Sequence, residues 1–166
     1  MNACVVLTVL APDRPGIVKA LSETVAAHDG NWLESRMARL AGHFAGILRV
    51  ECPDDRADAL IKALESLEGV SIQATREEPA STPEVELVKL EVVGNDRPGI
   101  VRELSAAIAA TGANLEELQT TLESAPMAGH PIFQARGTVA LPEGLSSSDL
   151  IAAIENLGAD LSVTVE

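Results

Sequence analysis

The sequence predicts an α+β protein made of two consecutive βαββαβ modules, each with a four-stranded antiparallel sheet and two helices on one face. Residues 7–34 and 90–117 align at a constant offset of 83, and half of the 28 aligned residues are identical. Within each copy, segments with alternating apolar residues flank segments with helical spacing. Right-handed crossovers would then close each copy into one antiparallel sheet.

The first strand and helix of each copy are the most regular part of the repeat. Apolar residues alternate along the strand: Val5, Leu7 and Val9, then Val88, Leu90 and Val92. Asp-Arg-Pro-Gly follows and predicts a helix start, because proline fits the first turn and aspartate can cap it. The expected buried stripe of the helix is Ile17, Val18, Leu21 and Val25, mirrored by Ile100, Val101, Leu104 and Ile108. Gly30 and Gly112 are expected to mark its exit.

Two further strands, a helix and a last strand complete each copy. We expect the paired strands at about 31–40 and 43–51, with a tight turn at Gly42, and at about 114–123 and 132–141. The apolar stripe of the second helix is Leu60, Ile61, Leu64 and Leu67, or Leu150, Ile151, Ile154 and Leu157. The last strands carry Val70, Ile72 and Ala74, or Leu161, Val163 and Val165.

The boundary between the copies is predicted from composition. Residues 77–84 contain two prolines, several acids and no large apolar side chain, which is typical of an extended linker. We therefore expect a first domain at 1–77, a linker at 78–84 and a second domain at 85–166.

Charge and composition argue against several classes of function. The net charge is −13, with −4 in residues 1–83 and −9 in residues 84–166, so the long-range field disfavours direct binding to nucleic acid. No apolar run is long enough for a membrane helix, and the N-terminal residues lack the pattern of a secretory signal, so we expect a cytoplasmic location. No set of residues has the spacing of a metal site or a catalytic triad, so we expect no metal, no cofactor and no enzymatic activity.

The two cysteines are expected to be small buried residues with free thiols. In the predicted topology the first and third strands are antiparallel neighbours. Cys4 opens one and Cys52 ends the other, so the two residues should lie near each other.

The run Asp13-Arg14-Pro15-Gly16-Ile17-Val18, its copy Asp96-Arg97-Pro98-Gly99-Ile100-Val101, and the asparagines Asn31 and Asn114 resemble the ACT family. ACT modules are ferredoxin-like βαββαβ units that bind amino acids and regulate other proteins. Two such modules in one short chain are similar to the glycine cleavage system transcriptional repressor group. The resemblance implies a sensor of a small amino acid, with glycine as one candidate, that acts through a protein partner such as a transcription factor.

The residues also suggest a ligand site of their own accord. A helix N-terminus suits a carboxylate, Gly16 and Gly99 leave room for it, and an aspartate can face an ammonium group. The asparagines are expected to begin a strand that returns past the same end of the module. The candidate ligand-binding residues are Asp13, Arg14, Pro15, Gly16, Ile17, Asn31, Asp96, Arg97, Pro98, Gly99, Ile100 and Asn114.

Other readings of the same residues remain open. Aspartate and proline are good helix starters whatever the loop binds, so a purely structural role would explain the repeat equally well. The chain could also be a scaffold that needs no ligand, or a regulatory subunit of a metabolic enzyme. A homodimer is expected by analogy, since sheets of this kind commonly pair by their edges.

Overall fold

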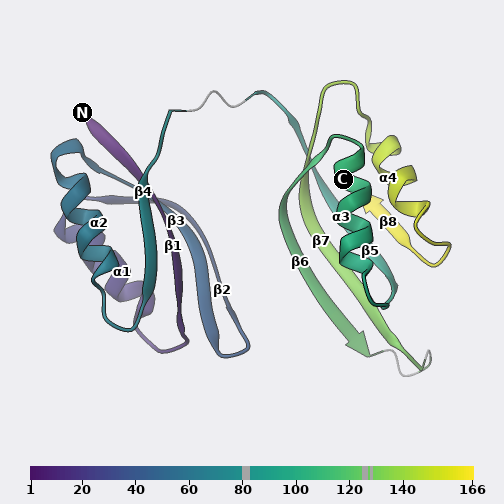
Figure 1. Cartoon of the computed structure of the whole chain (residues 1–166), viewed down its shortest axis with the longest axis horizontal. Coiled ribbons are helices and arrows are strands. Elements are labelled where there is room, and N and C mark those ends of the chain that lie inside the picture. Colours follow the sequence, from purple (N-terminus) through teal and green to yellow (C-terminus); the bar gives the residue numbers. More distant parts are fainter. Residues whose placement is uncertain (80–82, 125–126, 128) are drawn as a thin grey trace. The chain divides into compact units, whose positions relative to one another are not determined.

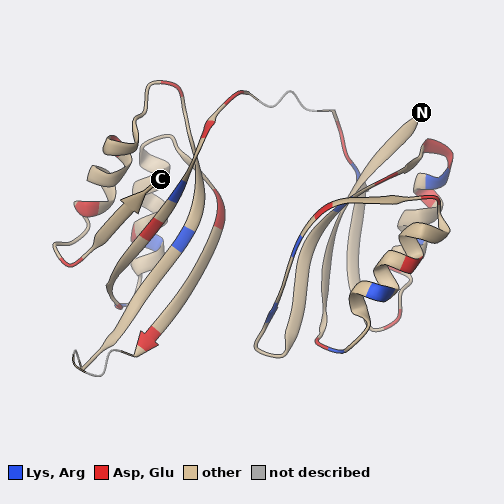
Figure 2. Cartoon of the chain, turned by 180° about the vertical axis from the view of Figure 1, so that it is seen from behind, with Lys and Arg blue, Asp and Glu red and all other residues tan. Residues whose placement is uncertain are grey.

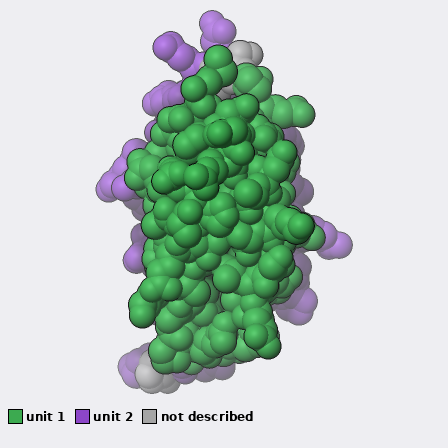
Figure 3. Space-filling view, turned by 90° about the vertical axis from the view of Figure 1, so that its left-hand side faces the viewer, with its two compact units in different colours: residues 1–81 green, residues 82–166 purple. Residues whose placement is uncertain are grey.

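The computed structural model describes residues 1–79, 83–124, 127 and 129–166. It divides the chain into two compact units, unit 1 (Met1–Ser81) and unit 2 (Thr82–Glu166), which Figure 3 shows in different colours. The linker expected at 78–84 spans this division and stays a prediction, and its residues 80–82 lie outside the described part of the chain.

Unit 1 is a four-stranded antiparallel sheet with two helices on one face (Figure 1). The strand order is β2-β3-β1-β4. A short 3-10 helix, Asp54–Arg56, precedes the second helix. The elements are β1 (Asn2–Pro12), α1 (Ile17–Ala27), β2 (Asn31–Leu40), β3 (His43–Pro53), α2 (Ala57–Glu65) and β4 (Ser71–Arg76).

Unit 2 repeats this topology with the strand order β6-β7-β5-β8. Its strands pair only with one another among the described residues, so the two modules are not interwoven. The predicted α+β fold class, with two ferredoxin-like units, is therefore confirmed. The elements are β5 (Glu86–Asn95), α3 (Ile100–Ala110), β6 (Asn114–Ser124), β7 (Pro131–Leu141), α4 (Ser147–Glu155) and β8 (Ser162–Val165).

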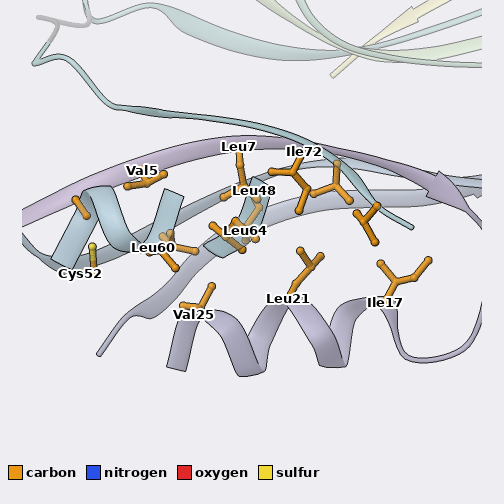
Figure 4. Close-up of a cluster of buried hydrophobic side chains, with 14 of the residues drawn as sticks. Val5, Leu7, Ile17, Leu21, Val25, Leu48, Cys52, Leu60, Leu64 and Ile72 are labelled. Carbon is orange, nitrogen blue, oxygen red and sulfur yellow. The ribbon is translucent and has the colours of Figure 1, made fainter. Parts of the chain in front are cut away.

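Each unit has its own apolar core between the sheet and its helices. In unit 1, alternate residues of β1 and β3 point toward α1 and α2, as Figure 4 shows for Val5, Leu7 and Leu48. Unit 2 buries the equivalent stripe from β5, β7, α3 and α4. The predicted helix stripes are wrong at one position each, because Val18 and Val101 are 46% and 41% exposed. They follow Ile17 and Ile100, and one helical step of about 100° turns them out of the core.

The helix starts and exits differ in detail from the prediction. Asp13 and Asp96 do not cap α1 and α3, because the N-cap residues are Gly16 and Gly99 in the left-handed conformation, with no side-chain cap. At the exit of α1, the residue with positive φ is Asp29 rather than Gly30. Gly112 takes the equivalent position in unit 2, with a φ of 86°.

The predicted neighbourhood of the two cysteines is confirmed. Cys52 of β3 pairs with Ala3 of β1, directly beside Cys4. The two side chains point to opposite faces of the sheet, because neighbouring residues of a strand alternate. Both thiols are free, and burial raises the pKa of the Cys52 thiol. This geometry keeps the two sulfur atoms from forming a disulfide within one unit.

Helix α4 has a side-chain cap that the other helices lack. The Ser146 hydroxyl accepts a hydrogen bond from the Asp149 N–H at 3.2 Å, and the Asp149 carboxylate accepts from the Ser146 N–H at 3.0 Å. The Ser146 hydroxyl also donates to this carboxylate at 2.9 Å, and the two bonds that the carboxylate accepts from Ser146 lower the pKa of Asp149. They satisfy donors at the helix start that would otherwise have no partner in the helix.

Replacing Ser146 with alanine should lower the free energy of unfolding of unit 2 by about 1 kcal/mol, because the cap is lost. Urea unfolding followed by circular dichroism measures this change. Ser147→Ala is the matched control, since Ser147 is already inside the helix. Equal stabilities of the two variants would contradict a capping role for Ser146.

Candidate functional site

The loop between the first strand and the first helix is held in the same way in both units. The Asp13 N–H donates to the Gly42 carbonyl at 2.9 Å, and the Asp96 N–H donates to the Pro131 carbonyl at 3.1 Å. Gly42 lies in the turn between β2 and β3, and Pro131 is the first residue of β7, directly after the equivalent connection. The loop therefore lies at one end of its sheet, next to that connection.

The arginine of the repeated loop has a structural role in each unit. Arg14 donates to the Glu68 carbonyl at 2.9 Å, and Arg97 donates to the Leu157 carbonyl at 3.2 Å. These carbonyls lie just beyond the C-terminal ends of α2 and α4, where a cation is favourable. Arg97 also forms an ion pair with Glu103 at 2.7 Å. These contacts explain why the arginine recurs without invoking a ligand.

The two asparagines do not join the loop residues of their own unit. Asn31 pairs with Glu51 and Asn114 pairs with Ala140, so both lie beside the N-terminal ends of β1 and β5. The loops lie at the opposite ends, about 30 Å away along a ten-residue strand. The prediction that they meet at one end is wrong, because the intervening helix runs back along the sheet before the next strand begins.

The remaining loop residues present mostly backbone. Gly16 and Gly99 begin the helices with φ values of 91° and 84°, and Pro15 and Pro98 are exposed. The side chains of Ile17 and Ile100 belong to the cores. The first N–H groups of each helix have no acceptor within the helix and carry a partial positive charge.

A depression of about 260 Å³ adjoins the loop of unit 2. It lies between the start of α3 and the strands β6 and β7. Asp96 contributes the only carboxylate of the lining and is half-buried. Among the described residues, this carboxylate forms no ion pair and no side-chain hydrogen bond. The lining consists of Asp96, Ile100, Val101, Thr120, Thr121, Leu122 and Phe133.

The corresponding aspartate of unit 1, Asp13, already has a charged partner. The Asp13 carboxylate accepts a hydrogen bond from Nε of Arg39 at 2.7 Å in an ion pair on the surface. Arg39 pairs with Phe44 across the sheet, just as Leu122 pairs with Phe133 in unit 2. The two loops are held by equivalent backbone hydrogen bonds, but the Asp13 carboxylate is already paired and the Asp96 carboxylate is not, among the residues that the structure describes.

A larger depression of about 370 Å³ lies on the open face of the unit 2 sheet, away from this loop. Half of its lining residues carry charged side chains, including Arg136 and Glu91, which pair with each other at 3.1 Å. It contains none of the predicted site residues. The smaller depression is the stronger candidate because a carboxylate, a helix start and apolar walls meet there.

Neither charged nor metal-ligating side chains indicate a second candidate site among the described residues. In the described part of the chain, the Lys and Arg positions are spread along the ribbons of both units (Figure 2). Within those same residues, no three His, Cys, Asp or Glu side chains are grouped to hold a metal ion. No described helix is long and apolar enough to cross a membrane.

Sequence reasoning missed the residues that shape the depression. Thr120, Leu122 and Phe133 lie on strands for which the sequence predicts no role beyond forming the sheet. The offset of 83 contained a usable signal, because it aligns Arg39 with Leu122 and shows that a charged residue in one copy is apolar in the other.

Comparison with known proteins identifies the family to which this fold belongs. The family model of the ACT domain matches residues 3–73, which is nearly all of unit 1. Unit 2 has the same topology and the same loop. The protein belongs to the ACT-domain family. Its two ACT units lie in tandem, as the sequence predicted.

Two solved structures match this tandem ACT protein over the full chain. The crystal structure of an unknown protein from Galdieria sulphuraria is 33% identical, with a TM-score of 0.87, and the match covers 100% of this chain and 98% of that one. A "putative glycine cleavage system transcriptional repressor" is 17% identical, with a TM-score of 0.68 and the same coverage. The second likeness concerns the fold alone. No curated protein matches the sequence.

Proposed function

We propose that this tandem ACT protein is a non-catalytic regulator that binds a free amino acid at the loop between β5 and α3 and acts through a protein partner. The observation that carries the proposal is the half-buried Asp96 carboxylate, which lines a depression at the start of α3. Membership of the ACT family supports it, since these modules typically bind amino acids for regulation.

The chemistry of the loop suits a zwitterion. The Asp96 carboxylate can accept hydrogen bonds from an ammonium group. The Ile100 N–H already donates to the Arg97 carbonyl at 3.3 Å. The N–H groups that follow it in the first turn of α3 can donate to a carboxylate, which the partial positive charge of the helix start favours. Charge-assisted hydrogen bonds contribute roughly 1.5–3 kcal/mol each. Three or four of them, less the cost of immobilising the ligand, correspond to a dissociation constant between about 1 μM and 1 mM.

Charge and fold support the proposed protein partner. With a net charge of −13, the chain is poorly suited to binding nucleic acid directly. A role in transcription would therefore pass through a DNA-binding protein, and the fold likeness to a glycine cleavage repressor makes a transcription factor the first candidate. The proposal includes a homodimer and a cytoplasmic location, where free amino acids are available.

Replacing Asp96 with asparagine should weaken amino-acid binding at least tenfold, because the ammonium group loses its charged partner. Isothermal titration calorimetry of the full chain with the twenty amino acids measures this effect. Asp13→Asn is the matched control, because the Asp13 carboxylate is already paired with Arg39. We expect that variant to bind as the unchanged protein does. A complete panel without binding would overturn the proposal and favour a ligand-independent scaffold.

A further inference from the structure

The two ACT units differ at the positions that surround the aspartate of the loop. Register across the sheet identifies the equivalent residues. Met37 pairs with Gly46 and Thr120 pairs with Ala135, while Arg39 pairs with Phe44 and Leu122 pairs with Phe133. Unit 1 thus carries methionine and arginine where unit 2 carries threonine and leucine.

In unit 1, these two side chains fill the position that corresponds to the depression of unit 2. Arg39 holds the Asp13 carboxylate at 2.7 Å and thereby takes the place of a ligand cation. Met37 packs against the apolar core, with its Cγ only 2.5 Å from the position that a Cβ on Gly46 would take. The methionine therefore fills the space that the glycine leaves. Neither obstacle exists in unit 2, since Thr120 is short and Leu122 has no charge.

The walls of the open depression are mainly apolar. Phe133 and Ile100 form a buried floor, at 3% and 5% exposure, whereas Val101 and Leu122 are 41% and 60% exposed to solvent. A ligand with an aliphatic side chain would cover these exposed groups and gain from their removal from water. Glycine has no side chain to cover Val101 and Leu122, so both would stay exposed to solvent. The volume of about 260 Å³ is below the usual range for drug-sized ligands and suits a small molecule.

We propose that unit 2 alone binds the ligand, that the ligand is an amino acid with an aliphatic side chain such as valine or leucine, and that Met37 and Arg39 keep the unit 1 site closed. This inference rests on the proposed function of the Asp96 loop. It adds the side-chain class of the ligand, a stoichiometry of one per chain and the residues that set both.

Calorimetry of the full chain tests the specificity and the stoichiometry. Leucine or valine should bind about tenfold more tightly than glycine, because burial of each methylene group adds to affinity. One ligand should bind per chain. Glycine binding as tightly as leucine, in an Asp96-dependent manner, would overturn this inference and leave the proposed function standing. Absence of binding by every amino acid would overturn the proposed function itself.

Exchanging the side chains between the units tests the closing residues. Leu122→Arg should copy the ion pair of unit 1 onto Asp96 and weaken leucine binding at least tenfold. Leu87→Arg is the matched control, because Leu87 is 55% exposed in the same unit and does not line the depression. Unchanged binding by Leu122→Arg, with its circular dichroism spectrum retained, would refute the role of this position.

The converse exchange should open the second site. In the double variant Met37→Thr with Arg39→Leu, we expect two ligands per chain. If this double variant loses its cooperative thermal transition, the single variant Arg39→Leu is titrated in its place, because that substitution alone frees the Asp13 carboxylate. A folded variant that still binds one ligand per chain would show that these residues do not close unit 1.

Discussion

Replacing Leu48 with alanine should destabilise unit 1 by about 3 kcal/mol, within the range of 2–5 kcal/mol for buried leucines. Leu48 lies on the central strand β3, where it pairs with Leu7 of β1, and it is fully buried beneath the two helices (Figure 4). Its removal leaves a cavity in a small core that has few other contacts to share the loss. The melting temperature of unit 1 should fall by about 10–20 °C.

The adjacent residue provides the control for this experiment. Ile47 lies on the same strand but points to the open face of the sheet, where it is 56% exposed. Ile47→Ala should therefore cost less than about 1 kcal/mol, since little area is removed from the core. Thermal and urea unfolding of both variants give the comparison. Similar losses for the two substitutions would mean that the core does not lie on the helix face of this sheet.

Replacing Gly16 with valine should destabilise unit 1 by about 1–3 kcal/mol, the usual cost of a strained backbone. Gly16 has a φ of 91°, a conformation that is a genuine outlier for a β-branched residue. No atom lies within 4 Å of the position that a Cβ would take. The loss would therefore come from the backbone and not from a steric clash with neighbours.

Gly16→Asn separates these two causes. Asparagine tolerates the left-handed conformation better than valine, so its cost should be clearly smaller. Urea unfolding with circular dichroism measures both variants. Full stability of the valine variant would show that the helix start can relax. Because Gly99 has a φ of 84°, a valine there would also weaken binding through the fold, which is why Asp96→Asn is the better test of the site.

The repeated sequence was sufficient to predict the fold. The offset of 83 defined the two modules, and alternation along β1 and β5 placed Leu7 and Leu90 on the buried face. These signals are local, because the period of a strand or helix is set by its own backbone. The same locality explains the errors at Val18 and Val101, since an apolar residue at the edge of a stripe does not reveal whether anything covers it.

The candidate site depended on long-range placement. The sequence singled out Asp96 and Gly99 but wrongly grouped them with Asn114, which starts β6 at the opposite end of the sheet. It also gave no sign that the Asp13 carboxylate is already paired while, within the described part of the chain, the Asp96 carboxylate is not. Pairing between strands decided both points, because it brings Arg39 to Asp13 in unit 1 and Leu122 to the depression beside Asp96 in unit 2.

By itself, the sequence determined the number of modules, the order of their elements and the composition of their cores, all of which follow from periodicities along the chain. Only the tertiary structure decided which end of each sheet an asparagine reaches, which carboxylate is already paired, and where apolar walls surround a charge. These properties depend on residues that are distant in sequence and become neighbours only when β2 pairs with β3, and β6 with β7. The physical reason is that pairing registers, unlike periodicities, arise from contacts between strands.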